Sequence, residues 1–399
     1  TMKIGLLTAG GLAPCLSASI GNLIGKYYDI SPDIEIIGYL NGYKGLLMGN
    51  SIQINENVKK NAVILNTFGG SPIGNSRVKL TNIKDCINKG YIKNGEIPLE
   101  VASRQLLDDG VNILHTIGGD DTNTMAAELS KHLADNGHDL IVVGLPKTVD
   151  NDVYPIHQSL GAWTAAEQGA IFFNNIVNEN TTSSRQLIIH EVMGRNCGWL
   201  TAATAYEYRQ KLNNRIFLPD ILVSKDRWDI DAVYIPEMTV DIPLESKRLK
   251  KIMDKKDSVN IFLSEGAGAD SIVRDMKSKG LEIEIDSFGH YRLDQINPGK
   301  WFGEQFANMI GAEKVLIQKS GYFARCAAPN QKDLELIKKS ALLAVECALN
   351  GTSGVIGLDE DSNNELKCID FVKIKGGKPF NIKNEWFTAM LRNIGQIGY

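Results

Sequence analysis

Short apolar runs alternate with longer stretches of helical periodicity along most of the chain. Residues 3–8, 113–118 and 141–145 are nearly continuous apolar runs, which is typical of strands buried on both faces. The first of these runs leads through glycines into a small-residue helix over 15–28, and the second leads into a helix after residue 122. This alternation predicts an α/β fold with doubly wound, mostly parallel sheets.

The same patterns extend over the remainder of the chain and suggest two lobes. Further strands are predicted at 34–40, 62–65, 186–192, 230–235, 259–263, 315–317, 355–358 and 368–374. Further helices are predicted at 99–109, 157–178, 200–209, 301–310, 334–348 and 386–394. The stretch 281–299 is read as an insertion of unknown shape. Lobe boundaries are expected at 1–160 with about 326–360, and at 161–325 with about 361–399.

The chain is organised around the stretch IVVGLPKTVDND at 141–152. Pro146 ends the apolar run, because proline lacks the N–H group that a strand ladder requires. Lys147, Thr148, Asp150 and Asp152 follow on the turn that leaves the strand, where open α/β sheets bind ligands. Taken alone, the segment is also compatible with a solvated surface loop.

A second strand upstream carries the same kind of ending. The stretch ILHTIGGDDT at 113–122 is an apolar run broken by glycines and followed by Asp120 and Asp121. Because parallel strands end at the same edge of a sheet, the acids and Lys147 should lie close together. This predicts a constellation for phosphate and metal binding.

Other glycine-rich turns follow predicted strands. They are AGG at 9–11, FGGSPIGNSR at 68–77 and MGRNCGW at 193–199. A strand, a glycine turn and a helix N-terminus together present backbone N–H groups to an anion. Each turn by itself could equally be a tight connection or a surface loop.

Composition narrows the classes of protein. Hydrophobic residues make up 43% and charged residues 23% of the 399 residues, with a net charge of −4 and no basic block. Nucleic acid is therefore not an expected partner. No signal peptide and no apolar run of roughly 18 residues is recognised, so no membrane partner is expected. Six scattered cysteines without a Cys-x-x-Cys pair suggest a reducing cytoplasm rather than disulfides or zinc.

The motifs together resemble those of the phosphofructokinase family. They occur in the order TAGG at 8–11, GGDDT at 118–122, PKTVDND at 146–152, MGR at 193–195, SEG at 264–266 and GYFAR at 321–325. ATP-using members typically carry glycine at the positions of Asp121 and Lys147. The chain therefore resembles more narrowly the pyrophosphate-dependent members.

This resemblance implies two Rossmann-like three-layer lobes with the active site in the cleft between them. It implies Mg²⁺-dependent, reversible phosphoryl transfer from pyrophosphate to the 1-hydroxyl of fructose 6-phosphate, the first lobe binding the donor and the second the sugar phosphate. The alternative is an ATP-dependent 6-phosphofructokinase. The GGD turn alone would also suit an NAD or lipid kinase, and a sugar-phosphate binding protein without catalysis would not need Asp150.

Phosphoryl transfer needs positioning and neutralisation of charge, and the first lobe offers candidates for each role. Asp150 is expected to accept the proton, Asp120 to hold Mg²⁺, and Lys147 and Asp121 to select the donor. Donor-binding residues are expected to be Gly10, Gly11, Arg77, Gly119 and Thr122.

The acceptor site follows from the resemblance. It implies that fructose 6-phosphate is bound by Thr148, Asp152, Met193, Gly194, Arg195, Glu265, Tyr322 and Arg325. Asp152 also orients its loop or assists the metal. Arg325 matches the family's phosphate-gripping arginine, and Tyr322 stands where ATP-using members carry histidine.

One position departs from the family pattern. Gln186 stands where a neighbouring subunit often supplies an arginine, and Arg185 lies beside it. Lys314 or Lys319 could supply the missing charge. A homodimer or homotetramer is expected.

Overall fold

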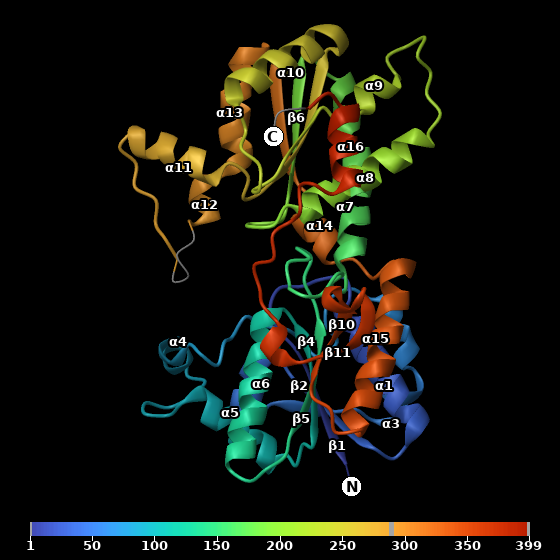
Figure 1. Ribbon diagram of the computed structural model, residues 1–399, viewed down its shortest axis with the longest axis vertical. Helices are drawn as coiled ribbons and strands as arrows, with labels where there is room; N and C mark the ends of the chain where they lie inside the picture. The colour runs from blue at the N-terminus through green and yellow to red at the C-terminus, as the bar shows by residue number, and fades with distance from the viewer. Residues whose placement is uncertain (1, 287–290, 397–399) are drawn as a thin grey trace. The chain divides into compact units, whose positions relative to one another are not determined.

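The computed structural model describes residues 2–286 and 291–396, without the side chain of Asp294, and its chain forms two compact units. Unit 1 comprises Thr1–Thr164 and Arg325–Lys378, and unit 2 comprises Ala165–Ala324 and Pro379–Tyr399. Each unit is built around its own sheet (Figure 1).

Unit 1 contains a seven-stranded sheet in the order β11-β10-β5-β4-β1-β2-β3. The five central strands are parallel, and β3 and β11 pair antiparallel at the two edges. The strands are β1 (Lys3–Thr8), β2 (Glu35–Tyr39), β3 (Ser51–Gln53), β4 (Ile113–Gly118), β5 (Ile141–Pro146), β10 (Gly354–Asp359) and β11 (Glu365–Ile369). The predicted α/β class is confirmed.

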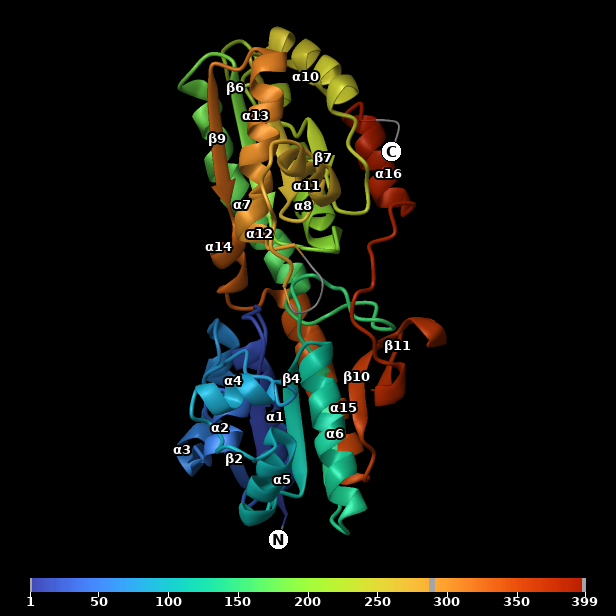
Figure 2. The same cartoon turned by 90° about the vertical axis from the view of Figure 1, so that its left-hand side faces the viewer.

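Helices cover both faces of this sheet (Figures 1 and 2). One layer contains α1 (Leu16–Ile30) and α15 (Gln331–Leu349), which pack on each other. The other contains α2 (Tyr43–Met48), α5 (Pro98–Asp108) and α6 (Asp120–Asp135), whose apolar residues form one core with β1, β2, β4 and β5. The short helices α3 (Glu56–Lys60) and α4 (Ile83–Asn88) are peripheral.

The strand order places a topological switch point between β1 and β4. The chain runs from β1 outward to β2 and then continues on the other side of β1 with β4 and β5. The carboxyl ends lie level, since Thr8 pairs with Ile117 and Gly118 pairs with Pro146. Ligands of open α/β sheets bind at such a point.

Unit 2 contains a four-stranded parallel sheet in the order β7-β8-β6-β9. Its strands are β6 (Gln186–Val192), β7 (Ala232–Tyr234), β8 (Ser258–Ser264) and β9 (Lys314–Lys319). One face packs against α7 (Ala162–Ile176), α8 (Trp199–Asn213) and α16 (Glu385–Asn393), and the other against α10 (Ile242–Lys256), α11 (Ala269–Ser278) and α13 (Pro298–Ile310). The short elements are α9 (Lys225–Trp228), α12 (Leu293–Ile296) and α14 (Gly321–Arg325).

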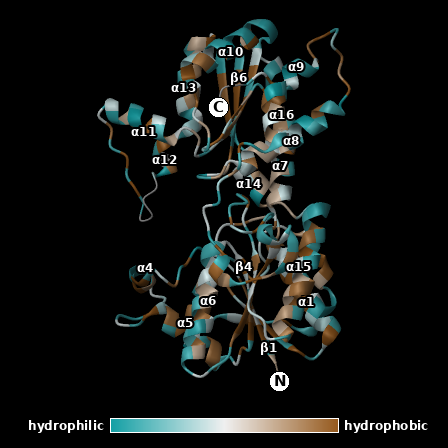
Figure 3. Ribbon diagram, viewed as in Figure 1, coloured by the Kyte–Doolittle hydropathy of each residue, from teal (hydrophilic) through white to brown (hydrophobic). Residues whose placement is uncertain are grey.

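The strands of both units are mainly apolar, whereas the helices carry apolar and polar residues (Figure 3). This is the pattern of sheets buried between helical layers. Within the ranges that the structure describes, no helix has the length and apolarity that crossing a bilayer requires.

Three sequence predictions differ from the structure. The predicted strand at 62–65 is the 3₁₀ helix η1 (Ala62–Thr67), which contacts α1 and belongs to neither sheet of the described residues, and Val63 is 70% exposed. The predicted strand at 368–374 ends at Ile369, and the 3₁₀ helix η4 (Phe371–Lys373) follows. Residues 361–378 lie in unit 1, because β11 pairs with β10.

The stretch 281–299 contains α12 and the start of α13, and its residues 287–290 lie outside the described ranges.

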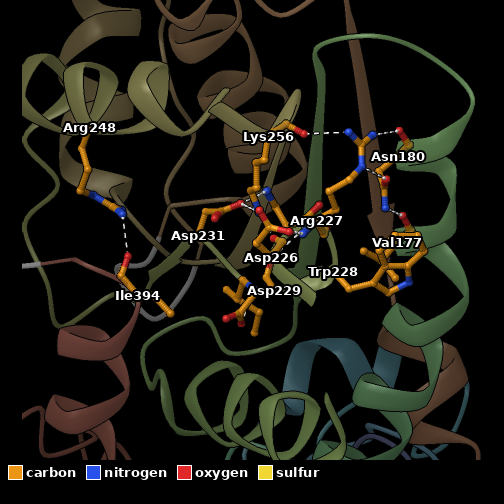
Figure 4. A network of polar contacts seen from close by, with 12 residues as sticks. Val177, Asn180, Asp226, Arg227, Trp228, Asp229, Asp231, Arg248, Lys256 and Ile394 are labelled. Atoms are coloured by element: carbon orange, nitrogen blue, oxygen red, sulfur yellow. Dashed lines mark hydrogen bonds and ion pairs between the residues drawn. The ribbon is translucent and has the colours of Figure 1, made fainter. Parts of the chain in front are cut away.

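A buried polar network ties together the ends of several elements of unit 2 (Figure 4). The Lys256 ammonium lies 2.8 Å from an Asp231 carboxylate oxygen, and the two side chains are 5% and 9% exposed. Arg227 donates to the backbone carbonyls of Lys256 and Asn180 at 2.9 and 3.0 Å. The network thereby joins α9 and the end of α10 to the chain after α7.

We expect Lys256→Ala to lower the free energy of unfolding of unit 2 by about 3–5 kcal/mol, because Asp231 would remain as a buried carboxylate without its cation. Lys250→Ala is the matched control on the same helix. Its ion pair with Asp254 is 2.9 Å long, with side chains 53% and 49% exposed, and should contribute less than about 1 kcal/mol. Urea unfolding of both variants measures the difference, and equal losses would contradict the expectation.

Candidate active site

The carboxyl ends of β1, β4 and β5 surround a pocket of about 380 Å³ in unit 1. It brings together most residues that the sequence assigned to the donor and the metal, and two of those assigned to the sugar. Its lining includes Gly10, Gly11, Arg77, Gly119, Asp120, Asp121, Thr122, Lys147, Thr148 and Asp152. The pocket therefore lies at the switch point of the sheet.

Cationic side chains gather over the glycine turn after β1. Lys147 donates through Nζ to the carbonyl oxygen of Gly11 at 2.5 Å, and a Cβ atom at Gly10 would lie 2.9 Å from that nitrogen. A Cβ atom at Gly11 would lie 2.7 Å from Nη2 of Arg77 and 3.2 Å from Nη1 of Arg325. The two glycines are needed here because the cations occupy the space of a side chain.

Lys147 is the most deeply buried of these cations, with 5% of its surface exposed. Burial, with smaller effects from the guanidinium groups of Arg77 and Arg325, lowers the pKa of Lys147 to about 8. The three cations near this glycine turn repel one another, and an anion bound among them would relieve this repulsion. The pocket is thus suited electrostatically to a phosphate group.

Three acidic residues, Asp120, Asp121 and Asp152, line the same pocket. α6 begins at Asp120, and Asp121 forms an ion pair with Lys79 at 3.1 Å. Burial raises the pKa of Asp120, and the charge of Asp121 raises it further. Burial and the neighbouring Asp120 raise the pKa of Asp152 in the same way. Asp120 and Asp152 both line the pocket, and the charge of Asp120 acts on Asp152.

These carboxylates fit Mg²⁺, because a cation between them would offset their mutual repulsion. Within residues 2–286 and 291–396, no cluster of three or more His, Cys, Asp or Glu side chains has the arrangement of a metal site. Mg²⁺ commonly uses one or two carboxylates and takes its other ligands from water and substrate phosphates. Asp120 with Asp152 matches that mode.

The loop that carries Thr148 and Asp150 is held in one conformation. The backbone N–H of Asp150 donates to Oγ1 of Thr148 at 3.1 Å. Asn151 adopts a left-handed backbone with φ of 54°, and its side-chain oxygen accepts from the N–H of Ser159 at 2.8 Å. Sequence reasoning missed Asn151, although asparagine tolerates this conformation better than most residues.

Two further residues near the pocket were missed. The Asn75 side chain donates to the carbonyl oxygen of Gly10, which fixes the glycine turn. Lys79 holds Asp121 at the pocket wall. Both lie in the 68–79 region, which the sequence marked only through its glycines and Arg77.

In unit 2, the residues assigned to the sugar phosphate form two interlocking loops. The backbone N–H of Gly194 donates to Oε1 of Glu265 at 3.2 Å, and the N–H of Glu265 donates to the carbonyl of Val192 at 2.8 Å. A Cβ atom at Gly266 would overlap the carbonyl oxygen of Arg195. The MGR and SEG motifs thus meet at the carboxyl ends of β6 and β8.

The remaining residues that the sequence assigned to fructose 6-phosphate have other neighbours in the structure. Met193 lies beside Gly321, which precedes Tyr322 on α14, and the Tyr322 side chain is 77% exposed. The guanidinium of Arg195 lies 3.2 Å from Asp286. Arg325 belongs to unit 1 and lies with Arg77 over the glycine turn. The structure therefore groups Arg325 with the predicted donor residues.

The position of Gln186 does not offer a side chain to a neighbouring subunit, because Gln186 is fully buried at the amino end of β6. The Arg185 guanidinium donates to the carbonyls of Ile310 and Gly311. Lys314 is paired with Glu179 at 2.6 Å. Lys319 is 64% exposed at the carboxyl end of β9. The homodimer or homotetramer stays a prediction.

Comparisons with known proteins identify the family of this chain. Residues 3–348 match the sequence profile of the phosphofructokinase family. A pyrophosphate–fructose 6-phosphate 1-phosphotransferase from Methylomonas methanica is 61% identical over 394 residues, which cover 99% of this chain and 96% of that protein. A protein of the same name from Mastigamoeba balamuthi is 54% identical over 98% of this chain and 96% of its own length.

A solved structure has the same fold. The pyrophosphate-dependent phosphofructokinase from Marinobacter aquaeolei superposes with a TM-score of 0.69 over 99% of this chain and 91% of that one, at 17% sequence identity. Sequence profile, relatives and fold agree over nearly the full length. The chain belongs to the phosphofructokinase family.

Proposed function

We propose that this protein transfers a phosphoryl group from pyrophosphate to the 1-hydroxyl of fructose 6-phosphate, forming fructose 1,6-bisphosphate and phosphate in a reversible, Mg²⁺-dependent reaction. The observation that carries the proposal is the buried Lys147 ammonium over Gly10 and Gly11, beside Arg77 and Arg325. The names of the relatives at 54% and 61% identity support the same reaction.

Charge alone can bind pyrophosphate in this pocket. Pyrophosphate has no adenosine to recognise, so its affinity must come from cations and N–H donors. Lys147, Arg77 and Arg325 supply the cations, and the backbone at Gly11, Gly119 and Thr122 supplies donors at a glycine turn and at the N-terminus of α6. The N–H of Gly10 is already bonded to the carbonyl of Ser76 at 2.9 Å. Asp121 on the pocket wall disfavours the additional phosphate of a nucleotide through like-charge repulsion.

Asp150 is assigned as the proton acceptor. As the 1-hydroxyl oxygen attacks the terminal phosphorus, a new P–O bond forms, the bridging P–O bond of pyrophosphate breaks and phosphate leaves. The hydroxyl proton passes to the Asp150 carboxylate. Lys147 and the two arginines offset the charge that is spread over the transferring group.

Asp120, assisted by Asp152, would hold Mg²⁺ through carboxylate oxygens. Bound Mg²⁺ neutralises negative charge on pyrophosphate. Burial raises the pKa of both carboxyl groups, and a neighbouring carboxylate raises each further, Asp121 for Asp120 and Asp120 for Asp152; a cation would offset this repulsion.

Within unit 2, fructose 6-phosphate is assigned to Met193, Gly194, Arg195, Glu265 and Tyr322. Glu265 has one oxygen on the Gly194 N–H, and its carboxylate suits sugar hydroxyls as an acceptor. Arg195 is suited to the 6-phosphate because its planar guanidinium offers several N–H donors.

We expect Asp150→Ala to reduce kcat by about 10²–10⁴-fold, with little change in the KM for fructose 6-phosphate, because a general base supplies roughly that factor. The control is Asp139→Ala, which removes an exposed carboxylate near the amino end of β5, at the opposite edge of the sheet. Steady-state kinetics measure both. An Asp150→Ala enzyme with more than half of wild-type turnover would exclude Asp150 as the base.

Donor choice is expected to depend on Lys147 and Asp121. The wild-type enzyme should use pyrophosphate and show negligible activity with ATP. Lys147→Gly should reduce kcat/KM for pyrophosphate by about 10–150-fold, the equivalent of a lost charge-assisted hydrogen bond. Asp121→Gly combined with Lys147→Gly should admit some ATP, whereas Asp121→Gly alone should not, because Lys147 still fills the space over Gly10.

A coupled assay with each donor tests this expectation. Wild-type turnover with ATP comparable to that with pyrophosphate would refute the donor assignment and leave the sugar assignment intact.

Substitutions of Arg325 and of Arg195 should raise the KM values of different substrates. Arg325→Ala should raise the KM for pyrophosphate more than that for fructose 6-phosphate, because Arg325 lies with Arg77 over Gly11. Arg195→Ala should show the opposite preference. Each loss should be about 10–150-fold, as for a charge-assisted bond. If Arg325→Ala acts mainly on fructose 6-phosphate, Arg325 is the sugar-phosphate arginine that the sequence suggested.

A further inference from the structure

Residues 374–378, the C-terminal strap, lie outside the segment 3–348 that the family profile matches. Their sequence, IKGGK, carries no catalytic motif. The strap follows η4, whose Phe371 packs against the core shared with α6. It nevertheless contacts the parts of unit 1 that carry both candidate metal carboxylates.

Gly376 lies directly against the Asp120 side chain. A Cβ atom at Gly376 would lie 2.6 Å from Cγ and 2.9 Å from Oδ1 of Asp120, and would overlap Oδ2. The carboxylate thus occupies the volume in which any other residue would place its side chain. The Gly376 backbone bounds the position that Asp120 can adopt.

The backbone conformation does not by itself explain the glycine at this position. Gly376 has no left-handed φ angle, so an alanine could adopt the same backbone without strain. The neighbouring Gly377 has a φ of 78° and open space at its Cβ position. What excludes a side chain at Gly376 is therefore the Asp120 carboxylate.

The strap is anchored on both sides of Gly376. Lys375 exchanges two backbone hydrogen bonds with Tyr154, at 2.8 and 2.9 Å. The backbone N–H of Lys378 donates to the carbonyl of Asp152 at 2.9 Å. The Lys378 ammonium donates to the carbonyl of Ile156 at 2.7 Å. These bonds attach the strap to the loop that follows β5.

The ammonium of Lys378 is also paired with Glu360 at 3.0 Å, and its side chain is only 17% exposed. It therefore joins the end of β10 to the loop that contains Asp152. A strap fixed at these points holds Gly376 against Asp120 and holds the Asp152 backbone at the same time.

We propose that the C-terminal strap is a positioning element of the Mg²⁺ site, in which Gly376 sets the place of the Asp120 carboxylate and Lys378 sets that of the Asp152 loop. This inference rests on the proposed function. Gly376 and Lys378 are positioning residues, because they act through the two carboxylates. Groups that orient metal ligands typically contribute about 10–100-fold to metal affinity or activity.

The test is the binding of pyrophosphate, measured by isothermal titration calorimetry without fructose 6-phosphate, in saturating Mg²⁺ and again in EDTA. Gly376→Ala should weaken binding about 10–100-fold in Mg²⁺ and leave the weaker binding in EDTA unchanged. Its KM for fructose 6-phosphate should stay within about twofold and its melting temperature should not fall, since alanine is compatible with the backbone.

Lys375→Ala is the matched control on the strap. Its side chain is exposed and its backbone bonds to Tyr154 are retained, so binding should equal that of the wild type. Lys378→Met, which keeps the apolar stem and removes the ammonium, is the second variant and should weaken Mg²⁺-dependent binding in the same direction. It replaces Gly376→Ala as the test should that variant not fold.

The outcomes separate the two proposals. Wild-type protein that does not bind pyrophosphate in Mg²⁺ would overturn the proposed function. Wild-type protein that binds, together with Gly376→Ala and Lys378→Met proteins that bind equally well, would overturn only the role of the strap. Equal weakening in Mg²⁺ and in EDTA would likewise overturn it, because the loss would not depend on the metal.

Discussion

The pocket at the carboxyl ends of β1, β4 and β5 brings charges of both signs close together at the edge of one sheet. Lys147, Arg77 and Arg325 lie over Gly10 and Gly11, and Asp120, Asp121 and Asp152 line the same pocket. Burial makes the charged forms of these side chains unfavourable, as the lowered pKa of Lys147 and the raised pKa of Asp120 indicate. In the function that we propose, pyrophosphate and Mg²⁺ would offset these charges, so the cost of the charges in the pocket would favour ligand binding.

The fold supports this arrangement by placing the carboxyl ends of β1, β4 and β5 side by side. Glycine is required where cations or carbonyl groups approach the backbone, and Asn151 is required where the loop after β5 turns into a left-handed conformation. Neither requirement concerns catalysis directly. Both decide whether Lys147, Asp150 and Asp152 can lie on one short loop in the orientation that the pocket needs.

The end of the chain contributes to both units through local contacts. Lys378 donates its N–H to the Asp152 carbonyl in unit 1, and Phe380 donates its N–H to Glu237 in unit 2 at 2.7 Å. Glu237 also accepts from the N–H of Gly198, at the start of α8. The sequence assigned no role to Lys378, Phe380 or Glu237, because their contacts here are hydrogen bonds of backbone N–H groups, which leave no motif.

The amino-acid sequence alone was enough to predict the α/β class and most central strands, because apolar runs and glycine turns are local signals that need no knowledge of distant segments. The roles of the donor residues stay predictions. The strand prediction was wrong at 62–65, where apolar residues lie in a 3₁₀ helix that belongs to neither sheet of the described residues. Only the tertiary structure decided that Arg325 lies beside Arg77 and that Gly376 bounds Asp120. These contacts join residues more than 200 positions apart, and local pattern carries no information about such pairings.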